Sequence, residues 1–355
     1  ASAIPARCAD GTTGAGGTPF ANAAPDVTLF ARDWRAQRSV RSNLSWAGPV
    51  LGNRFAASVE GTLSLNHHLP NFVDLNAAAA QRFTLGAEGG RPVYVRPSSI
   101  VPATGAAAAA DGRASAAFSR VAEQRSDLRS VSRQVQAFLR PTAFNPTFGW
   151  SVGYTFQDAR DQARGFQSAA GDPRAVEWAR GAFNTRHGVN YSLRYNFFNT
   201  VTVDWSGVAR SGLPYTPGVA GDVNGDGYAN DRAFVFDPRA TAAAAPALAA
   251  ELDALLAGGG RGAACLRRQL GRVAARNSCE GPWTQTANLS VSFNPLKVRL
   301  PQRASLSFTL SNPLGAADRL LHGGSNLRGW GQQPSPDPTL LYVRGFDAAA
   351  GRFRY

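Results

Sequence analysis

Apolar and polar side chains alternate along several long segments of the chain. Between Phe55 and Asn66, every second residue is apolar or glycine, and the residues between them are small or polar. A period of two places the two sets on opposite faces of an extended strand. This segment covers about a dozen residues, whereas strands of soluble proteins usually have about five or six. The pattern therefore predicts long strands with two different faces.

The same alternation recurs in pairs of segments along the chain. The clearest example runs from Phe148 to Phe156, where large apolar side chains alternate with glycine, serine and threonine. Each pair is joined by a short link that is rich in turn-forming residues. We predict about ten antiparallel strands, paired within residues 36–66, 124–158, 186–210, 283–311 and 339–355.

Short and long connections alternate between these strands. The predicted long inserts are residues 67–123, 158–184, 211–282 and 312–337. Consecutive connections of an up-and-down sheet lie at opposite ends, so all the long inserts should share one end. Short turns at one end and long loops at the other are typical of outer-membrane barrels. Residues 1–35, rich in Gly, Ala, Thr and Pro, are expected to form a further external loop.

The two predicted faces differ as the wall of such a barrel requires. One face is apolar, with aromatic side chains near the strand ends, and the other carries Ser, Thr, Asn, Gln, Gly and Arg. A soluble β-sandwich would show similar alternation over shorter strands and with shorter connections. We therefore predict an all-β fold: a segment of an antiparallel up-and-down transmembrane β-barrel with long external loops. The aromatic side chains are interpreted as lipid-facing and packing groups, with a sugar- or base-stacking surface as the alternative.

Composition and charge exclude some classes of function. The net charge is +13, and Lys297 is the only lysine, so nearly all of the positive charge is arginine. The arginines are scattered singly rather than in basic runs, so we predict no binding of nucleic acid. A basic lumen, or basic loops that meet anionic lipid head groups or anionic substrates, fits this charge better.

Residues 222–231 form the clearest candidate site. Asp222, Asn224 and Asp226 fall at positions 1, 3 and 5 of a calcium-binding loop, and Gly227 falls at the sharp turn at position 6. We predict that Ca²⁺ binds here, where it would stiffen an external loop. The candidate ligands are Asp222, Asn224, Asp226, Tyr228 (through its backbone carbonyl), Asn230 and Asp231.

One departure from the calcium pattern keeps a second interpretation open. Ala233 stands at position 12, where a calcium loop has a bidentate glutamate, although Asp231 could take over that role. In the alternative, the Asp and Asn side chains only cap their own backbone in Asx turns, and the glycines supply positive φ angles.

The cysteines and histidines point to no catalytic site. Cys265 and Cys279 lie fourteen residues apart in one polar insert, and we predict a disulfide between them in an oxidising compartment. Two unpaired thiols are the alternative, and Cys8 has no assigned partner. None of the four histidines accompanies a nucleophile motif or a metal-ligand motif. We therefore predict that the chain is not an enzyme.

Four segments resemble one known family. They are RSVRSNLSWAGPVLGNRF (38–55), VEWARGAFNTRHGVNYSLRYNFF (176–198), RSGLPYTPGVAGDVNGDGYANDRAFVFDP (210–238) and RRQLGRVAARNSCEGPWTQTANLSVSFNP (267–295). They are similar to the C-terminal barrel portion of TonB-dependent outer-membrane receptors, of the Oar-like kind with a carboxypeptidase-regulatory-like domain. The last two segments are the more specific ones.

The resemblance implies a barrel of 22 strands in the bacterial outer membrane that takes up a scarce ligand with energy delivered by TonB. Its partners would be outer-membrane lipid, the unidentified ligand, and a plug domain and TonB. No plug, TonB box or final barrel strand can be assigned within these residues. The chain contains no Met, so we expect it to be a mature form or a fragment. Because it supplies about ten of the 22 strands, we expect it to be one part of a larger barrel.

Two alternatives come from other classes of function. The first is an outer-membrane structural or adhesion protein whose external loops are braced by calcium. The second is a secreted calcium-binding β module. A chain that is soluble and monomeric without detergent would exclude both the outer-membrane receptor and the outer-membrane structural or adhesion protein.

Overall fold

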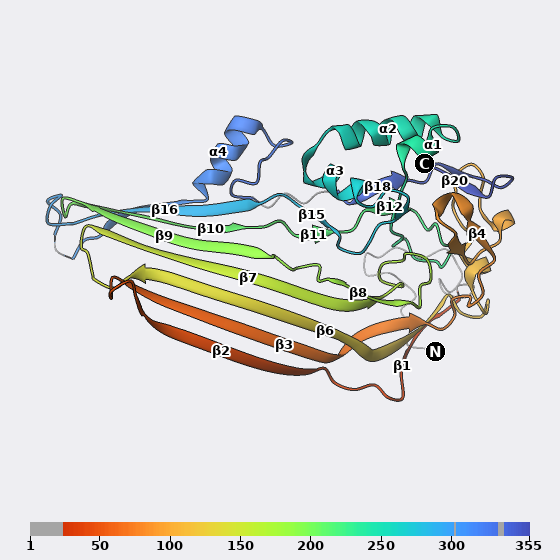
Figure 1. Cartoon of the computed structure of the whole chain (residues 1–355), viewed down its shortest axis with the longest axis horizontal. Coiled ribbons are helices and arrows are strands. Elements are labelled where there is room, and N and C mark those ends of the chain that lie inside the picture. Colours follow the sequence, from red (N-terminus) through yellow and green to blue (C-terminus); the bar gives the residue numbers. More distant parts are fainter. Residues whose placement is uncertain (1–23, 302, 333–336) are drawn as a thin grey trace, which may run out of the picture.

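The computed structural model of the protein describes residues 24–301, 303–332 and 337–355. Its main feature is one long sheet of ten strands (Figure 1). In the order β17-β16-β10-β9-β7-β6-β3-β2, neighbouring strands are antiparallel, while β8 extends the pairing along β7 and β1 runs parallel to β6. The strands of this sheet are β1 (Asp26–Phe30), β2 (Arg38–Val50), β3 (Phe55–Asp74), β6 (Arg120–Pro141), β7 (Phe148–Arg164), β8 (Val176–Arg180), β9 (His187–Phe197), β10 (Val201–Arg210), β16 (Thr284–Phe293) and β17 (Leu306–Ser311).

The short links lie at one end of this sheet and three of the long inserts at the other, on the left and right of Figure 1. The link between β9 and β10 is tight because Phe198 and Asn199 have positive φ angles of 51° and 53°. Such angles match the twist of the two strands that a short hairpin joins. The predicted asymmetry between turns and inserts is therefore present in the structure.

Strand register lines up the apolar positions across the sheet. Trp150, Leu193, Trp205, Leu289 and Leu310 lie opposite one another on successive strands. Because side chains of directly opposed residues share a face, these residues form one continuous apolar row. Many large side chains of this face are exposed, among them Leu44, which is 81% exposed, and Leu193, which is 44% exposed.

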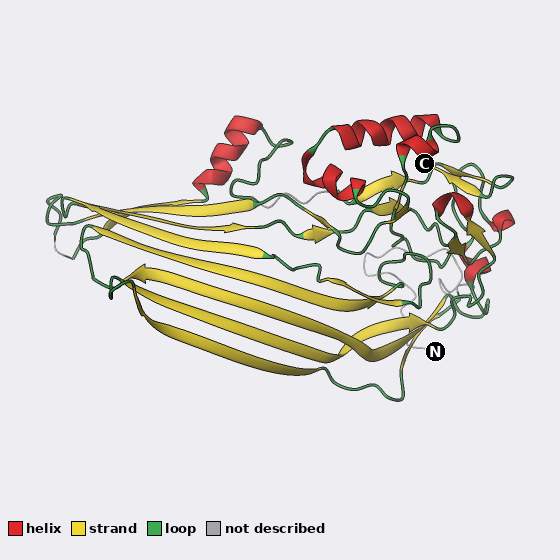
Figure 2. Cartoon of the chain, viewed as in Figure 1, coloured by secondary structure: helices red, strands yellow, loops and turns green. Residues whose placement is uncertain are grey.

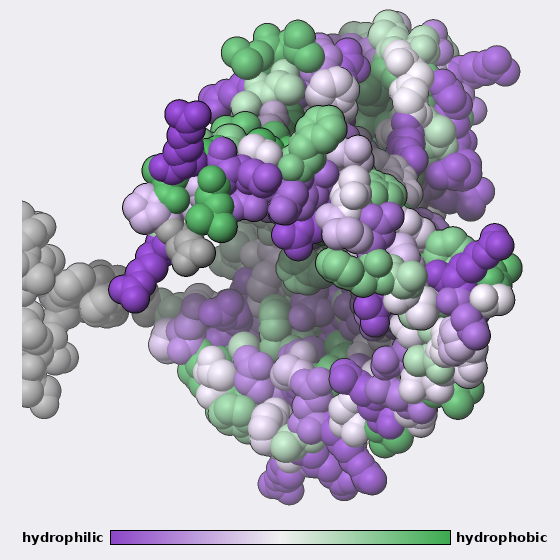
Figure 3. All heavy atoms as spheres, turned by 90° about the vertical axis from the view of Figure 1, so that its left-hand side faces the viewer, coloured by the Kyte–Doolittle hydropathy of each residue, from purple (hydrophilic) through white to green (hydrophobic). Residues whose placement is uncertain are grey.

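The sheet is not closed into a barrel. Its two edges are β2 and β17, which do not pair with each other among the described residues. Figure 3, which looks from the hairpin end, shows a hollow that the sheet and the inserts surround only in part. The fold is thus a mostly antiparallel β structure with few helices. No helix in the described part of the chain is long and apolar enough to span a membrane.

The inserts pack into a separate small core beside the end of the sheet opposite the short links. Buried members of this core include Leu85, Val95, Val223 and Phe234. Residues 75–119 contribute β4 (Phe83–Leu85), β5 (Arg91–Val93) and the 3-10 helices η1 (Gly86–Glu88), η2 (Pro97–Ser99) and η3 (Ala109–Gly112). Residues 211–283 contribute β11 (Pro214–Tyr215), β12 (Gly218–Ala220), β13 (Phe234–Val235), β14 (Arg272–Val273), β15 (Cys279–Glu280), α1 (Pro238–Thr241), α2 (Pro246–Ala257) and α3 (Gly260–Arg267).

The strand pair that we predicted within residues 339–355 does not belong to the long sheet, so this prediction is wrong. β18 (Thr339–Tyr342) instead runs parallel to β12, and β19 (Gly345–Asp347) pairs with β20 (Arg352–Arg354). The reason is burial: Leu341, Phe346 and Phe353 enter the core of the inserts. Their alternation suits a small core as well as it suits a barrel wall, so periodicity could not separate the two.

Other boundaries differ from the prediction as well. β3 and β7 continue into the predicted inserts 67–123 and 158–184, and β1 lies in the predicted loop 1–35. The insert 312–337 contains α4 (Pro313–His322), which begins where the Asn312 side chain accepts a hydrogen bond from Gly315 N. In Figure 2, the helices lie in the segments that connect or follow the long strands. Cys8 and most of the loop 1–35 lie outside the described residues.

Candidate functional site

The loop of residues 222–231 folds around its own side chains. Asp222 accepts hydrogen bonds from Gly225 N (2.7 Å) and Gly227 N (2.8 Å). Asn224 Oδ1 accepts one from Asp226 N (3.0 Å), and Asp226 Oδ1 accepts one from Tyr228 N (2.8 Å). Each is a short-range bond from backbone to an Asp or Asn side chain, as in Asx turns. These bonds define the local turns of the loop.

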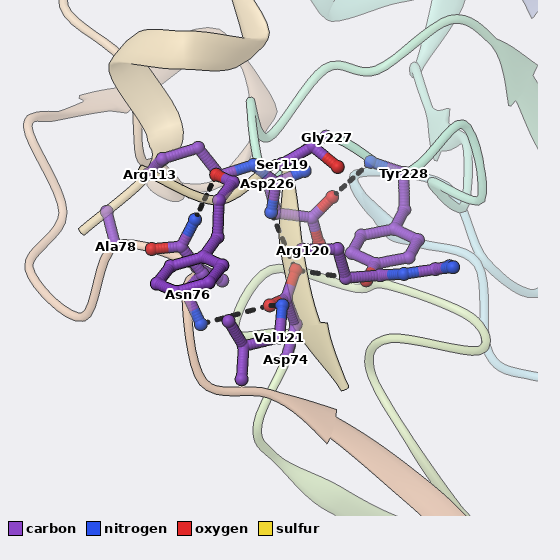
Figure 4. A network of polar contacts seen from close by, with 12 residues as sticks. Asp74, Asn76, Ala78, Arg113, Ser119, Arg120, Val121, Asp226, Gly227 and Tyr228 are labelled. Atoms are coloured by element: carbon purple, nitrogen blue, oxygen red, sulfur yellow. Dashed lines mark hydrogen bonds and ion pairs between the residues drawn. The ribbon is translucent and has the colours of Figure 1, made fainter. Parts of the chain in front are cut away.

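A buried carboxylate from a distant strand end fixes one side of the loop. Asp74, at the end of β3, is fully buried and accepts hydrogen bonds from the Tyr228 hydroxyl (3.0 Å) and from Arg113 Nη1 (2.6 Å). It also accepts bonds from Asn76 N (3.0 Å) and Val121 N (3.1 Å). Figure 4 shows these groups converging on Asp74. The loop is therefore anchored to the sheet and to the insert 75–119.

A buried arginine fixes the other side. Arg91 Nη1 lies 3.6 Å from Asp231 Oδ1, Arg91 Nε lies 3.1 Å from Glu88 Oε2, and all three side chains are almost fully buried. Asp231 Oδ2 also accepts hydrogen bonds from Val223 N (2.6 Å) and Asn224 N (3.0 Å). The two contacts of Arg91 are ion pairs without hydrogen-bond alignment, whereas its Nη2 donates to Arg232 O at 2.7 Å.

Burial and mutual repulsion raise the pKa values of the loop carboxyls. Loss of hydration, and next the charge of Asp222, raise the pKa of Asp226 to about 7. Loss of hydration also raises the pKa of Asp231 to about 8, although Arg91 opposes this shift. The pKa of Asp222 is raised by burial as well. Three carboxyls thus share a poorly hydrated site. A proton, or another cation, lowers the electrostatic cost of burying their negative charges there.

The structure brings the predicted calcium ligands into one loop, but some of their atoms already have other contacts. Asn224 Nδ2 donates to Asp226 Oδ2 (3.0 Å), and Asn230 Nδ2 donates to Phe166 O (2.6 Å). Within the described ranges, no group of three or more His, Cys, Asp or Glu side chains is arranged to hold a metal ion. Calcium binding by this loop stays a prediction.

Chelation gives a direct test of the calcium prediction. We expect millimolar Ca²⁺ to slow proteolysis within residues 211–238 relative to EGTA, because a bound ion would brace the loop. A raised pKa means that a proton must leave Asp226 before Ca²⁺ binds, so the protection should be greater at pH 8 than at pH 6. Cleavage elsewhere in the same samples is the control, and equal rates in Ca²⁺ and EGTA would favour the plain turn.

Cys265 and Cys279 are joined by a disulfide in the structure, with their Cα atoms 5.5 Å apart. The bond ties the end of α3 to β15, and both cysteines are buried. Gln269 packs against it and accepts a hydrogen bond from Ala275 N (2.8 Å). The disulfide therefore closes the loop that follows α3.

Residues of the insert 67–123 were missing from the sequence-based candidates for this site. Asp74, Glu88, Arg91 and Arg113 hold the loop, yet they precede it in the chain by more than one hundred residues. No local spacing relates these residues to the DVNGDG segment. The one available signal was the presence of charged residues in an otherwise small and apolar insert.

No protein-family model matches the chain, and no curated protein matches it. Among solved structures, the FrpB iron transporter from Neisseria meningitidis (F3-3 variant) is similar, with a TM-score of 0.34 and 10% sequence identity. The match covers 76% of this chain and 25% of that chain, so the chain spans about a quarter of the length of that transporter. A similarity of this size supports no argument about function.

Proposed function

We propose that this chain is the C-terminal barrel part of a TonB-dependent outer-membrane receptor that takes up a scarce ligand. The observation that carries the proposal is the exposed apolar face of the ten-stranded sheet, whose rows run in register from β7 to β17. Soluble monomers rarely expose apolar patches larger than a few hundred Å². A lipid bilayer covers such a face without any further protein.

The open edges support a barrel larger than these strands. The outer strands β2 and β17 each have one side without a neighbouring strand in the described structure. In hydrocarbon, each unpaired backbone group costs several kcal/mol, so a membrane-embedded sheet has to close. Additional strands of the parent protein would pair with both edges. A 22-stranded receptor barrel provides them.

The other face of the sheet suits a hydrated interior. Arg194 of β9 lies 3.6 Å from Asp204 on the neighbouring strand β10, and the two side chains are 66% and 44% exposed. A plug domain of the parent protein would lie against this face, and TonB would act on that plug. The chain itself would contribute wall and external loops to transport rather than catalysis.

An outer-membrane structural or adhesion protein is the second candidate. It shares the barrel wall, and the compact inserts at the external end favour it as a surface for contacts with other molecules. The two candidates differ in their dependence on TonB, because only a transporter requires it.

Membrane flotation tests the proposal. Full-length protein refolded with lipid vesicles is expected to float with them and to resist extraction by urea and alkali. Cross-linking in cells should then join it to TonB. A protein that stays monomeric in buffer without detergent would refute both membrane functions, and a vesicle-bound protein without TonB contact would favour the structural role.

A further inference from the structure

A group of arginines extends the apolar face toward the end that carries the inserts. Strand alternation places Arg133 of β6 on the same face as Val135, and Arg160 of β7 on the same face as Phe156. Arg38 and Arg129 share this face because both lie opposite His67 in the register of β2, β3 and β6. We call Arg38, Arg129, Arg133, Arg160 and Arg180 the basic belt.

Two members of the basic belt repel each other. Arg160 and Arg180 lie directly opposite one another on β7 and β8, and like charges in such positions destabilise a sheet. Arg180 is compensated by Glu280, whose Oε2 lies 2.7 Å from Arg180 Nη1. Arg160 is exposed and has no ion-pair partner in the part of the chain that the structure describes. An added anion beside Arg160 would remove this repulsion.

A basic cavity of about 560 Å³ adjoins these two arginines. It lies between β8 and the segment from α3 to β15, and its lining contains two glutamates. Glu177 lies 2.7 Å from Arg232, and Glu280 lies 2.7 Å from Arg180, so both glutamates already have partners. The arginines of its lining are Arg160, Arg180, Arg186, Arg261, Arg268 and Arg276. Three of these arginines have carboxylate partners too: Arg186 pairs with Asp158, Arg261 with Glu280 and Arg276 with Asp161. Arg160 and Arg268 form no ion pair within the described residues, and they leave the cavity with an excess of positive charge.

The position of the belt indicates what its anion is. If the apolar face lies in hydrocarbon, as the proposed function requires, the belt lies at the level of the external head groups. Trp178, which is exposed beside Arg160 and Arg180, is a side chain that favours this interface. Guanidinium groups bind phosphate with two parallel hydrogen bonds. Asp158 also lies on this face, directly opposite Arg133 in the register of β6 and β7, and its Oδ1 is 3.7 Å from Arg186 Nη2.

We propose that the basic belt and its cavity bind the phosphate groups of a phosphorylated lipid in the outer leaflet. The inference rests on the proposed function, because only an embedded sheet brings these arginines to lipid head groups. Binding would neutralise the Arg160–Arg180 pair and fix the height of the sheet in the membrane. The occupant is a lipid rather than free phosphate because the belt continues directly from the apolar face.

Lipid binding by full-length protein in a neutral detergent tests the proposal. The probe is a disaccharide lipid that carries two phosphates, compared by native mass spectrometry with the same lipid after removal of both phosphates. The wild-type protein should bind the phosphorylated form at least about tenfold more tightly. Arg133→Ser combined with Arg160→Ser should weaken that binding about 25-fold, at about fivefold for each arginine lost near the lipid surface.

Arg140→Ser is the matched control, because Arg140 lies on β6 like Arg133 but on the opposite face and near the hairpin end. This variant should bind both lipids as the wild-type protein does. Equal affinity of the wild-type protein for the two lipids would refute the inference. It would also be refuted if Arg133→Ser, Arg160→Ser and their combination all bound the phosphorylated lipid as tightly as the wild-type protein does. Displacement of the lipid by an equal concentration of inorganic phosphate would also refute it, in favour of a free-phosphate site.

The outcomes separate this inference from the proposed function. A protein that floats with vesicles but does not distinguish the two lipids contradicts only the phosphate site. A protein that is soluble without detergent contradicts the barrel function and removes the basis of the inference.

Discussion

Replacing Leu193 by arginine is expected to destabilise the protein in a lipid bilayer by about 2–4 kcal/mol. Leu193 is the middle one of five alternating side chains on the apolar face of β9, and its cross-strand neighbours are Trp150 and Trp205. It is 44% exposed although it lies within a row of apolar residues. On a wall that faces lipid, a guanidinium group at this place loses its water. The midpoint of unfolding by urea in vesicles measures the effect.

Asn190→Arg is the matched control on the same strand. Asn190 belongs to the opposite face, where it lies across from Gly153 and Val208 and is exposed. In the proposed barrel, an arginine there would point into the hydrated interior, so the urea midpoint should change little. Equal effects of the two substitutions would argue that neither face contacts lipid. A larger effect at Asn190 would reverse the assignment of the faces.

Much of the long sheet could be predicted from the sequence because a period of two is a local property. The hairpins β6–β7 and β9–β10 each combine clean alternation with a turn of a few residues, so their pairing follows from adjacency in the chain. The lengths of the strands were less predictable than their pairing. β3 continues past its apolar alternation to Asp74, because a neighbouring strand is present to pair with it.

The parts that could not be predicted depend on contacts between distant segments. Residues 339–355 alternate like a barrel strand, yet the core beside β12 takes up Leu341 and Phe346. The loop at Asp222 was found by its spacing, whereas its anchors, Asp74 and Arg91, have no sequence relation to it. The end of the sheet to which three of the four inserts belong could be predicted, but how these inserts pack together could not.

Replacing Arg91 by methionine is expected to cost about 3–5 kcal/mol of the stability of the packed inserts. Arg91 is fully buried between Glu88 and Asp231, so its loss leaves two carboxyls in a poorly hydrated core. Burial already raises the pKa of Glu88 against the opposing charge of Arg91. Without Arg91, both carboxyls would have to bind protons or draw in water. Faster proteolysis within residues 211–238 is the expected readout, because cleavage follows the population of the opened state.

Arg96→Met is the control that separates the influence of burial from that of ion-pair distance on the stability of the inserts. Arg96 lies only 2.7 Å from Asp111, closer than either ion-pair contact of Arg91, but its side chain is 64% exposed. Water and salt screen such a pair, so its loss should destabilise the inserts far less than the loss of Arg91. Adding Glu88→Gln and Asp231→Asn to Arg91→Met should restore part of the protection, because neutral amides need no counter-charge. If Arg91→Met and Arg96→Met accelerated cleavage equally, the buried arginine could not be what holds the loop to the insert.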